Sequence, residues 1–302
     1  MIWASKSTEL MHALEVAPAG ETVQLHAGTF TAPPGGFVVP RGMRIEGAHP
    51  LRNRFRGGTI IEPASPDDSG LVIPGGVDNV TITDLILRGP ERPGRGDGIR
   101  LIQTGTTACV ELHNVSVWGF GRDGLHFEIT KGSVDLLLIE GCLSHHNGRH
   151  GLYVAGPYGP IVRGGYYSRN GGAGVMFDLC GAVAVLQVGL EANQQRAPAG
   201  DYAPELYLRG GSAHNVDGCR FEDWARAGGS HAAITVENAK GVRIVGCSLV
   251  GLGDTPCRGV LFRNQCDACE IGLNTWVRVS RPTDIDASCT SIAVTKPQAI
   301  VS

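Results

Sequence analysis

Short runs of alternating apolar and polar residues recur along the chain, separated by corners rich in glycine and asparagine. One such unit is written three times between Asn114 and Asp178, at 114–127, 141–154 and 165–177. An alternation with a period of two is typical of half-buried strands, whereas helices have a period near 3.6. A strand pattern that recurs every 25 residues or so predicts a solenoid, at about one coil per repeat.

The first inward apolar residue after each corner is spaced by 23 to 31 residues along the chain: Ile99, Leu125, Leu152, Val175, Leu206, Ile234 and Val260. A coil of this length holds about three short strands, and equivalent strands of successive coils then lie parallel, about 4.8 Å apart. A leucine-rich repeat would need a Leu-x-x-Leu-x-Leu spacing, and a β-propeller would need paired hairpin turns. Neither occurs, so the sequence predicts an all-β fold, a parallel β-helix.

The amino-terminal residues follow a different pattern. At about 5–17, Leu10, Met11, Leu14 and Ala17 have helical spacing, with Ser7 as the predicted N-cap. A short helix over the open end of a solenoid shields its first strands from edge-to-edge association. We expect a single domain over 1–302, with this capping helix at its start and a C-terminal cap or tail at 280–302.

The segment from Ala13 to Phe30 contains a Pro-Ala-Gly turn followed by a Gly-Thr-Phe step. It resembles the start of proteins of the pectate-lyase-like right-handed β-helix superfamily, which share the pectin lyase-like fold. The coil pattern extends this resemblance over most of the chain. The resemblance implies a right-handed parallel β-helix with a short N-terminal capping helix.

The charge balance bears on the kinds of partner that the protein could bind. The net charge of the 302 residues is −3, so no global feature points to nucleic acid or membrane. The amino terminus lacks a basic stretch followed by an apolar run, so we expect a cytoplasmic protein, or a secreted one if the sequence is a trimmed mature form. Whether it is a monomer or a homo-oligomer stays open.

Nine cysteines are an odd number, which fits reduced thiols better than a disulfide framework. Cys142, Cys219 and Cys247 each follow a glycine that opens a coil, and we expect them to form an inward stack. Cys266 and Cys269 have the spacing of half a zinc site without a second half, so they are predicted to be structural. No metal and no cofactor are expected.

Two structural features are predicted at the corners. Asn147, Asn170 and Asn193 recur at intervals of 23 residues, and asparagine tolerates the left-handed conformation, so we expect a ladder of stacked amides. The variable part of each coil lies just before the anchor strand, at 89–98, 194–205, 225–231 and 251–258. Loops collected at one corner usually frame a binding face, so the anchor strands are predicted to carry the groove.

Alternation along these strands sends two vertical rows of side chains outward. The first row is Arg100, His126, Tyr153, Met176, Tyr207, Thr235 and Leu261, and the second is Ile102, Glu128, Ala155, Asp178, Arg209, Glu237 and Arg263. The candidate catalytic residues are His126, Tyr153, Asp178 and Glu128. The candidate substrate-binding residues are Arg100, Arg122, Arg149, His150, Tyr207 and Arg209.

Histidine, tyrosine, carboxylate and arginine side chains on one face are the groups needed to remove a proton next to a carboxylate. Arginine would neutralise the substrate carboxylate and the developing enolate, while histidine or tyrosine takes the proton and the other group returns one. His145 and His146 fall on another corner and are predicted to be solvated. Arginines at 52, 54, 56, 92 and 95 could gather an anionic substrate, although charged loops usually serve solubility.

The resemblance implies a metal-independent polyuronate lyase or C5 epimerase that uses His, Tyr and Arg. A calcium-dependent pectate lyase would need clustered carboxylates, and a polygalacturonase-like hydrolase would need paired Asp residues and a Gly-His-Gly segment. Neither pattern is present. The separation of Glu128 from Asp178, about 10 Å over two coils, still suits an inverting hydrolase.

Two other functions stay open. A cytoplasmic isomerase, dehydratase or cyclase could act on a small metabolite on the same scaffold, and closure of the groove by residues 194–205 would favour it. A non-enzymatic tailspike-like or adhesive β-helix is the third reading. Such proteins usually form trimers and carry attachment domains.

Overall fold

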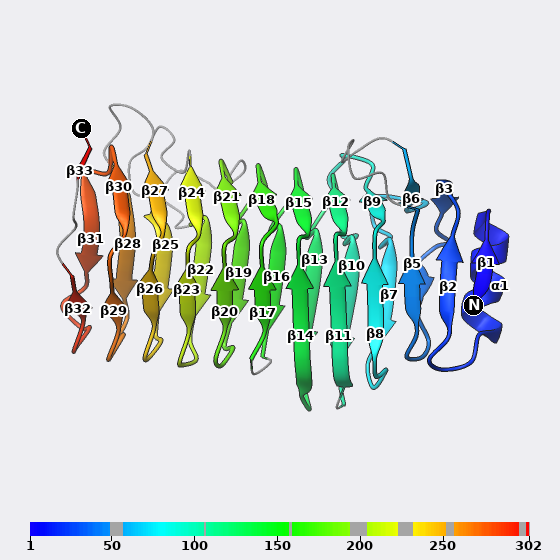
Figure 1. The fold of residues 1–302 in the computed structure, drawn as a ribbon, viewed down its shortest axis with the longest axis horizontal. Helices are drawn as coiled ribbons and strands as arrows, with labels where there is room; N and C mark the ends of the chain where they lie inside the picture. The colour runs from blue at the N-terminus through cyan, green and yellow to red at the C-terminus, as the bar shows by residue number, and fades with distance from the viewer. Residues whose placement is uncertain are drawn as a thin grey trace.

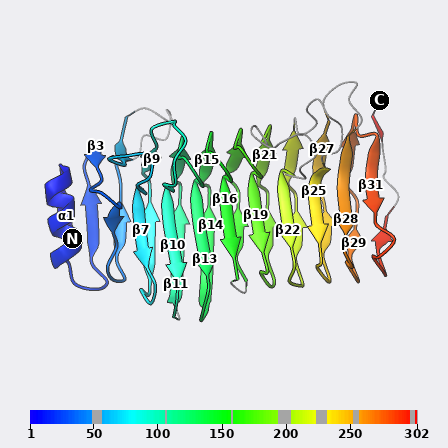
Figure 2. The same ribbon diagram turned by 180° about the vertical axis from the view of Figure 1, so that it is seen from behind.

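The computed structural model describes residues 1–48, 57–105, 107–156, 159–193, 204–222, 232–251, 257–295 and 300–301 of the chain. These residues form an all-β solenoid in which successive coils lie side by side along the long axis of the molecule (Figure 1). Each coil runs through three parallel sheets, which we call A, B and C, in that order. Figure 2 shows the same coils from behind.

Sheet A contains twelve described strands: β1 (Ile2–Ala4), β2 (Thr22–Leu25), β5 (Arg44–Glu46), β8 (Val80–Thr83), β11 (Thr107–His113), β14 (Val134–Glu140), β17 (Ile161–Arg163), β20 (Ala184–Leu186), β23 (Asn215–Asp217), β26 (Arg243–Val245), β29 (Glu270–Ile271) and β32 (Ala293–Val294).

Sheet B contains eleven described strands: β3 (Gly28–Thr31), β6 (Thr59–Glu62), β9 (Ile86–Arg88), β12 (Ser116–Trp118), β15 (Leu143–His145), β18 (Tyr166–Ser168), β21 (Gly189–Glu191), β24 (Arg220–Glu222), β27 (Ser248–Val250), β30 (Thr275–Val277) and β33 (Ile300–Val301).

Sheet C contains ten described strands: β4 (Phe37–Val38), β7 (Leu71–Pro74), β10 (Ile99–Gln103), β13 (Leu125–Ile129), β16 (Leu152–Ala155), β19 (Val175–Asp178), β22 (Leu206–Arg209), β25 (Ala232–Glu237), β28 (Arg258–Arg263) and β31 (Arg281–Ile285). The last strand of each sheet lies within 280–302, the segment for which the sequence predicted a cap or tail.

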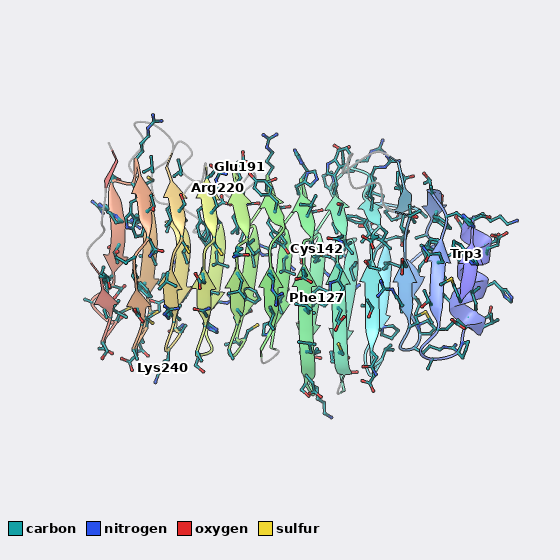
Figure 3. The ribbon with its side chains drawn as sticks, in the orientation of Figure 1. Trp3, Phe127, Cys142, Glu191, Arg220 and Lys240 are labelled. Carbon is teal, nitrogen blue, oxygen red and sulfur yellow. The ribbon has the colours of Figure 1, made fainter. Side chains whose placement is uncertain are left out.

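The predicted anchors of sheet C are confirmed. All seven are paired in the predicted order, from Ile99 with Leu125 to Ile234 with Val260. Each anchor and the residue two positions later, for example Leu125 and Phe127, are buried (Phe127 in Figure 3). The outward residues between them are therefore on the predicted face, and a one-residue register slip is excluded.

The helix α1 (Ser7–Val16) lies at the amino-terminal end of the solenoid, as predicted (Figure 1). Two details differ from the prediction. Lys6 occupies the N-cap position, while the Ser7 hydroxyl accepts the Thr31 backbone N–H at 2.8 Å instead. Met11 is 47% exposed, because only Leu10, Ala13 and Leu14 face the first coil. No described helix is long and apolar enough to span a bilayer.

The asparagine ladder is present at the B–C corner, where each coil passes from sheet B to sheet C. The Oδ1 atom of Asn170 accepts the backbone N–H of Asn147 at 3.1 Å and its side-chain amide at 3.0 Å. Asn193 accepts from Asn170 in the same way, and the buried carboxylate of Glu205 ends the ladder. These bonds satisfy amides that are shut off from water.

The predicted reason for these asparagines was wrong in one respect. The left-handed conformation belongs to the residue before each of them, at His146, Arg169 and Ala192, whose φ angles are 57°, 54° and 50°. The asparagine side chain supplies the inter-coil hydrogen bonds, and its neighbour turns the chain.

The cysteines agree with the prediction of reduced thiols. All nine are free, and Cys142, Cys219 and Cys247 are buried (Cys142 in Figure 3). Cys266 and Cys269 are also buried, and their thiols contact backbone carbonyl oxygens.

Candidate active site

Sheet C brings together the first outward row as predicted. His126 on β13 lies beside Arg100 on β10 and Tyr153 on β16, and Tyr153 is followed by Met176 and Tyr207. In the second row Ala155 lies between Glu128 and Asp178, and Asp178 pairs with Arg209. Neighbouring strands are about 4.8 Å apart, so side chains of adjacent coils are within contact distance.

His126 faces outward but is not open to solvent, because neighbouring side chains cover it. Its side chain is only 2% exposed. The ring of Tyr153 stacks on it, with centroids 5.0 Å apart and planes 16° apart. The Arg149 side chain reaches over the same ring, 4.8 Å from the Tyr153 centroid. The polar outer face predicted from alternation is therefore a packed layer around His126.

His126 lies between two carboxylates. Its Nδ1 is 2.8 Å from Asp123 Oδ2, and its Nε2 is 3.2 Å from Glu128 Oε2. An ionised Asp123 can only accept hydrogen bonds, so Nδ1 carries the hydrogen. The Nε2 atom is then left to exchange a proton with Glu128, whose side chain is 39% exposed.

Asp123 is completely buried and holds the centre of this group. It accepts hydrogen bonds from Arg149 Nε at 2.8 Å and from the His150 backbone N–H at 3.0 Å, besides His126. Burial opposes its ionisation, but the hydrogen bonds from Arg149 and His126 outweigh burial and hold the pKa of this carboxyl well below its usual range. Asp123 therefore stays charged and orients both partners.

One coil earlier, Asp97 forms a similar buried pair with Arg122, whose Nε donates to Asp97 Oδ1 at 2.8 Å. Burial raises the pKa of Asp97, and the neighbouring charge of Asp123 adds to the effect, while Arg122 opposes it. Arg122 and Arg149 were predicted to bind substrate, but both guanidinium groups are occupied by these carboxylates. Their first role in the structure is to neutralise buried charge.

A second ladder connects these corner residues. The side chains of Asp97, Asp123 and His150 accept the backbone N–H groups of Asp123, His150 and Ala173 at 3.0, 3.0 and 3.1 Å. His150 accepts through Nδ1, and burial lowers its pKa to about 4, so it is neutral near pH 7. His150 was predicted to bind substrate. Because its Nδ1 accepts the Ala173 backbone N–H, only Nε2 could contact a ligand.

Tyr153 has the properties of a proton donor rather than a base. Burial and the charges of Asp178 and Glu128 raise its pKa to about 12. Its hydroxyl donates to Asp178 Oδ2 at 3.3 Å, and Asp178 also accepts from Arg209 Nε at 2.7 Å. Arg209, predicted to bind substrate, is thus paired with Asp178 while remaining 44% exposed.

The remaining predicted residues divide into two groups. Arg100 forms no ion pair or hydrogen bond that involves its side chain within the described part of the chain, and it lies beside His126. Tyr207 belongs to a separate cluster, in which Arg263 Nη2 donates to its hydroxyl at 2.6 Å and Glu237 accepts from that hydroxyl. Arg100 is thus a cation available to a ligand, whereas Tyr207 is engaged in its own network.

One group of potential metal ligands occurs among the described residues, formed by Asp97, Asp123 and His126. All three are buried, and both carboxylates are bound by arginines. A cation at this place would have to displace these guanidinium groups, so we treat the group as a structural network.

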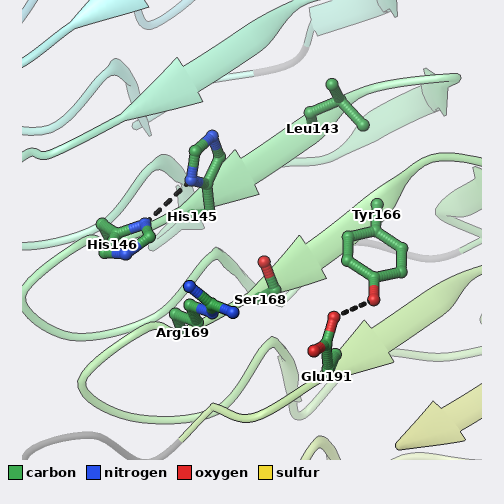
Figure 4. A pocket seen from close by; sticks show the side chains of 7 residues that line it. All are labelled: Leu143, His145, His146, Tyr166, Ser168, Arg169 and Glu191. Carbon is green, nitrogen blue, oxygen red and sulfur yellow. Dashed lines mark hydrogen bonds between the residues drawn. The ribbon is translucent and has the colours of Figure 1, made fainter. Parts of the chain in front are cut away.

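A hollow lies on sheet B, on the other side of the B–C corner, where the sequence predicted no site. It measures about 360 Å³ and is lined by Leu143, His145, His146, Tyr166, Ser168, Arg169 and Glu191 (Figure 4). His145 is partly buried in its wall rather than solvated, which corrects the prediction, while His146 is exposed. The sequence held one signal for this site, since Tyr166 and Glu191 are one coil apart.

Asp97 and Asp123 lie in the corners just before β10 and β13, so the two outward rows predicted for sheet C did not include them. Their signal in the sequence is an Asp-Gly-apolar step repeated one coil apart, at 97–99 and 123–125. Several predicted features lie outside the described residues: the arginines at 52, 54 and 56, the loop at 225–231, and most of the loops at 194–205 and 251–258. Closure of the groove by 194–205, which would favour a small-metabolite enzyme, therefore concerns residues that lie mostly outside the described ranges.

Comparison with known proteins identifies the class. A family model described as a right handed beta helix region matches residues 97–276, and the chain belongs to this family. The predicted resemblance to pectin lyase-like β-helix proteins is thereby confirmed. No curated protein matches the chain in sequence.

Solved structures share the fold at low sequence identity. The A-module of mannuronan C-5 epimerase AlgE4 from Azotobacter vinelandii is 16% identical, with a TM-score of 0.58 over 98% of this chain and 97% of that one. An alginate lyase from a Paenibacillus species is 13% identical, with a TM-score of 0.57 over 99% of both chains. The active domain of tailspike protein 2 from bacteriophage CBA120 is 12% identical, with a TM-score of 0.66 over 89% of this chain and 40% of that one. At such identities the likeness extends to the fold alone.

Proposed function

We propose that the protein is a carbohydrate-active enzyme that acts on a uronate-containing saccharide by proton abstraction, as a metal-independent lyase or epimerase. The observation that carries this proposal is the group of His126, Glu128 and Tyr153 on sheet C, with Arg100 beside it. The epimerase and alginate lyase among the similar folds support the substrate class by analogy.

The proton is taken by Glu128. Its carboxylate is partly exposed, and His126 Nε2 contacts it at 3.2 Å, so Glu128 and His126 can share the abstracted proton. Asp123 keeps the other nitrogen of His126 protonated and fixes the ring. The electron pair left on the substrate carbon moves into an enolate, whose charge Arg100 neutralises.

Tyr153 supplies the second proton. Its hydroxyl is protonated at neutral pH and can donate a proton; the raised pKa of about 12 makes it a weak acid, which suits a strongly basic leaving oxygen. In an elimination the bond from carbon to the glycosidic oxygen breaks, and Tyr153 protonates the leaving oxygen. In an epimerisation no bond to oxygen breaks, and a proton returns to the same carbon from the opposite face.

We place the sugar over Ala155, which has the smallest side chain of the second outward row. Ala155 lies between Glu128 and Asp178 on the adjacent strands, and the Tyr153 hydroxyl donates to Asp178 Oδ2. The proposed acid Tyr153 is therefore on β16 itself, and the proposed base Glu128 lies beside Ala155 of the same strand.

The test uses polygalacturonate and alginate, with and without a chelator. Ultraviolet absorbance detects unsaturated uronate, and proton NMR in deuterated water detects epimerisation or exchange. We expect chelator-insensitive turnover that falls about 10²-fold or more in Glu128→Gln. Glu140→Gln is the matched control, because Glu140 on sheet A has the same 39% side-chain exposure. Equal activity of both variants, or no turnover of either polymer, would contradict the proposal.

A further inference from the structure

The hollow on sheet B has the size of a small-ligand site. Its volume of about 360 Å³ falls at the lower end of the range for small-ligand pockets, about 300–1,000 Å³. Residues 146–151 join the end of β15, beside this pocket, to the start of β16, which carries Tyr153. The pocket and the proposed active site thus lie on the two sides of one corner.

Aromatic rings form part of the pocket surroundings. The indole of Trp118 stacks on His145 with centroids 6.0 Å apart and planes 4° apart. The phenol of Tyr166 lies over Gly189 on the next strand, where an added Cβ would come within 2.3 Å of the Tyr166 ring. Gly189 therefore makes room for the ring, and the Tyr166 hydroxyl reaches Glu191 (Figure 4).

The polar groups of the pocket are of two kinds. Glu191 offers carboxylate oxygens, and Ser168 offers a hydroxyl, both suited to sugar hydroxyl groups. Arg169 stands exposed at the rim, and no hydrogen bond or ion pair of its side chain occurs among the residues that the structure describes. Its φ of 54° is unusual for arginine, and the turn at this position directs the chain around the pocket.

The histidines act as neutral groups. Burial lowers the pKa of His145 to about 4, and burial together with Arg169 also lowers the pKa of His146. Their Nδ1 atoms are 2.9 Å apart, so one imidazole donates to the other. No third His, Cys, Asp or Glu joins them in a metal-ligand group among the described residues.

We propose that this pocket is a second, non-catalytic saccharide site that binds one acidic sugar residue. The sugar ring packs against Tyr166 and His145, and Trp118 supports the His145 ring from the neighbouring strand, since aromatic faces combine apolar area with polar edges. Arg169 binds the sugar carboxylate, and Glu191 with Ser168 binds hydroxyl groups. The ligand class follows from these side chains, so the inference does not rest on the chemistry proposed at Glu128.

The test measures binding of galacturonate and mannuronate oligosaccharides, from dimer to hexamer, to the full chain by calorimetry. Arg169→Asn removes the cation, and asparagine tolerates the left-handed backbone at this position, so the fold is retained. We expect Kd to rise at least tenfold in Arg169→Asn and severalfold in Tyr166→Phe. Arg163→Gln is the control, because Arg163 is a 52% exposed arginine of the same coil on sheet A.

A second comparison separates the two sites. Arg100→Gln removes the Arg100 charge on sheet C and should reduce turnover, while the binding that depends on Arg169 persists. Unchanged binding in Arg169→Asn, or binding that is lost only in Arg100→Gln, would overturn the second site. The absence of measurable binding by every oligosaccharide would overturn it too. Turnover is measured separately from binding. If no product forms but binding still depends on Arg169, the enzymatic proposal fails and the second site stands.

Discussion

The imidazole of His126 lies nearly parallel to the phenol ring of Tyr153, 5.0 Å from it, on the neighbouring strand. This stack shields His126 so far that its side chain is 2% exposed. The shielded ring contacts the half-exposed Glu128 through Nε2. In the proposed reaction a substrate would therefore meet Glu128 and the Tyr153 hydroxyl, while His126 lies behind them, where it positions Glu128 and shares its proton.

Replacing Tyr153 by phenylalanine tests the acid role without removing the stack. We expect kcat to fall by about 10²–10⁴-fold, because the variant keeps the ring over His126 but has no proton to donate. Stability should change by less than about 1 kcal/mol, since one partly exposed hydrogen bond to Asp178 is lost. Steady-state kinetics and urea unfolding measure the two effects. Wild-type kcat in Tyr153→Phe would exclude Tyr153 as the acid.

Filling the space over Ala155 should obstruct the substrate. Ala155 lies between Glu128 and Asp178, and a leucine there would occupy the surface that we assign to the sugar. We expect Ala155→Leu to raise KM by about tenfold or more, with the folded state intact because the side chain points outward. Ala184→Leu on sheet A, where Ala184 is also partly exposed, is the control. Equal KM values in the two variants would place the substrate elsewhere.

Asp123→Asn should destabilise the protein and change its acid response. The pKa of Asp123 in the folded state lies below its unfolded value of about 3.9, so its charge stabilises the fold above about pH 4. That contribution is lost as the pH falls below the unfolded value towards the folded one. Breaking a buried ion pair costs about 3–5 kcal/mol, so we expect the free energy of unfolding at pH 7 to fall by this amount. We also expect the free energy of unfolding to depend less steeply on pH below pH 4. Urea unfolding at pH 3 to 7 measures both.

Asp97→Asn is the comparison for Asp123. Burial raises the pKa of Asp97 in the folded state, so its charged form gains less from its surroundings. A neutral asparagine should therefore cost less stability at pH 7 than the same change at Asp123. If Asp97→Asn proved the more damaging of the two, the assignment of Asp123 as the ionised centre would fail.

Asn170→Ala should break the asparagine ladder at its middle. The Asn170 side chain accepts two hydrogen bonds from Asn147 and donates to Asn193, all in the buried interior. We expect a loss of about 3 kcal/mol, because buried groups on both neighbours lose their partner. Asn215→Ala, at a partly exposed position of sheet A, should cost less than about 0.5 kcal/mol. Thermal or urea unfolding of both variants tests the difference, and similar losses would mean that the ladder adds little stability.

Much of the fold could be predicted because successive side chains of a strand point alternately into the core and out of it. Once Leu125 and Leu152 are equivalent, His126 must lie beside Tyr153, and Glu128 beside Ala155. The capping helix and the asparagine ladder were also readable, since both depend on short-range spacing. The conformation of the corner was not predictable, because the left-handed φ belongs to His146, the residue before Asn147, and is set by the surrounding turn.

The outward residues of sheet C were predictable from alternation, but the buried carboxylates behind them were not. The sequence placed arginines near carboxylates, but it could not show that Arg122 and Arg149 are paired with Asp97 and Asp123. It could not show the pocket between Tyr166 and Arg169 either, because no local pattern encodes an opening between coils.

The sequence by itself determined which residues face outward and which coils are neighbours, because alternation and repeat length are properties of the chain. Only the tertiary structure decided which charges pair, that His126 is covered, and where a hollow remains. These depend on how side chains of adjacent coils fill the few ångströms between strands. Long side chains such as Arg149 and Tyr153 can lie along a strand or reach across to the next one, and contacts with the neighbouring side chains decide which of the two occurs.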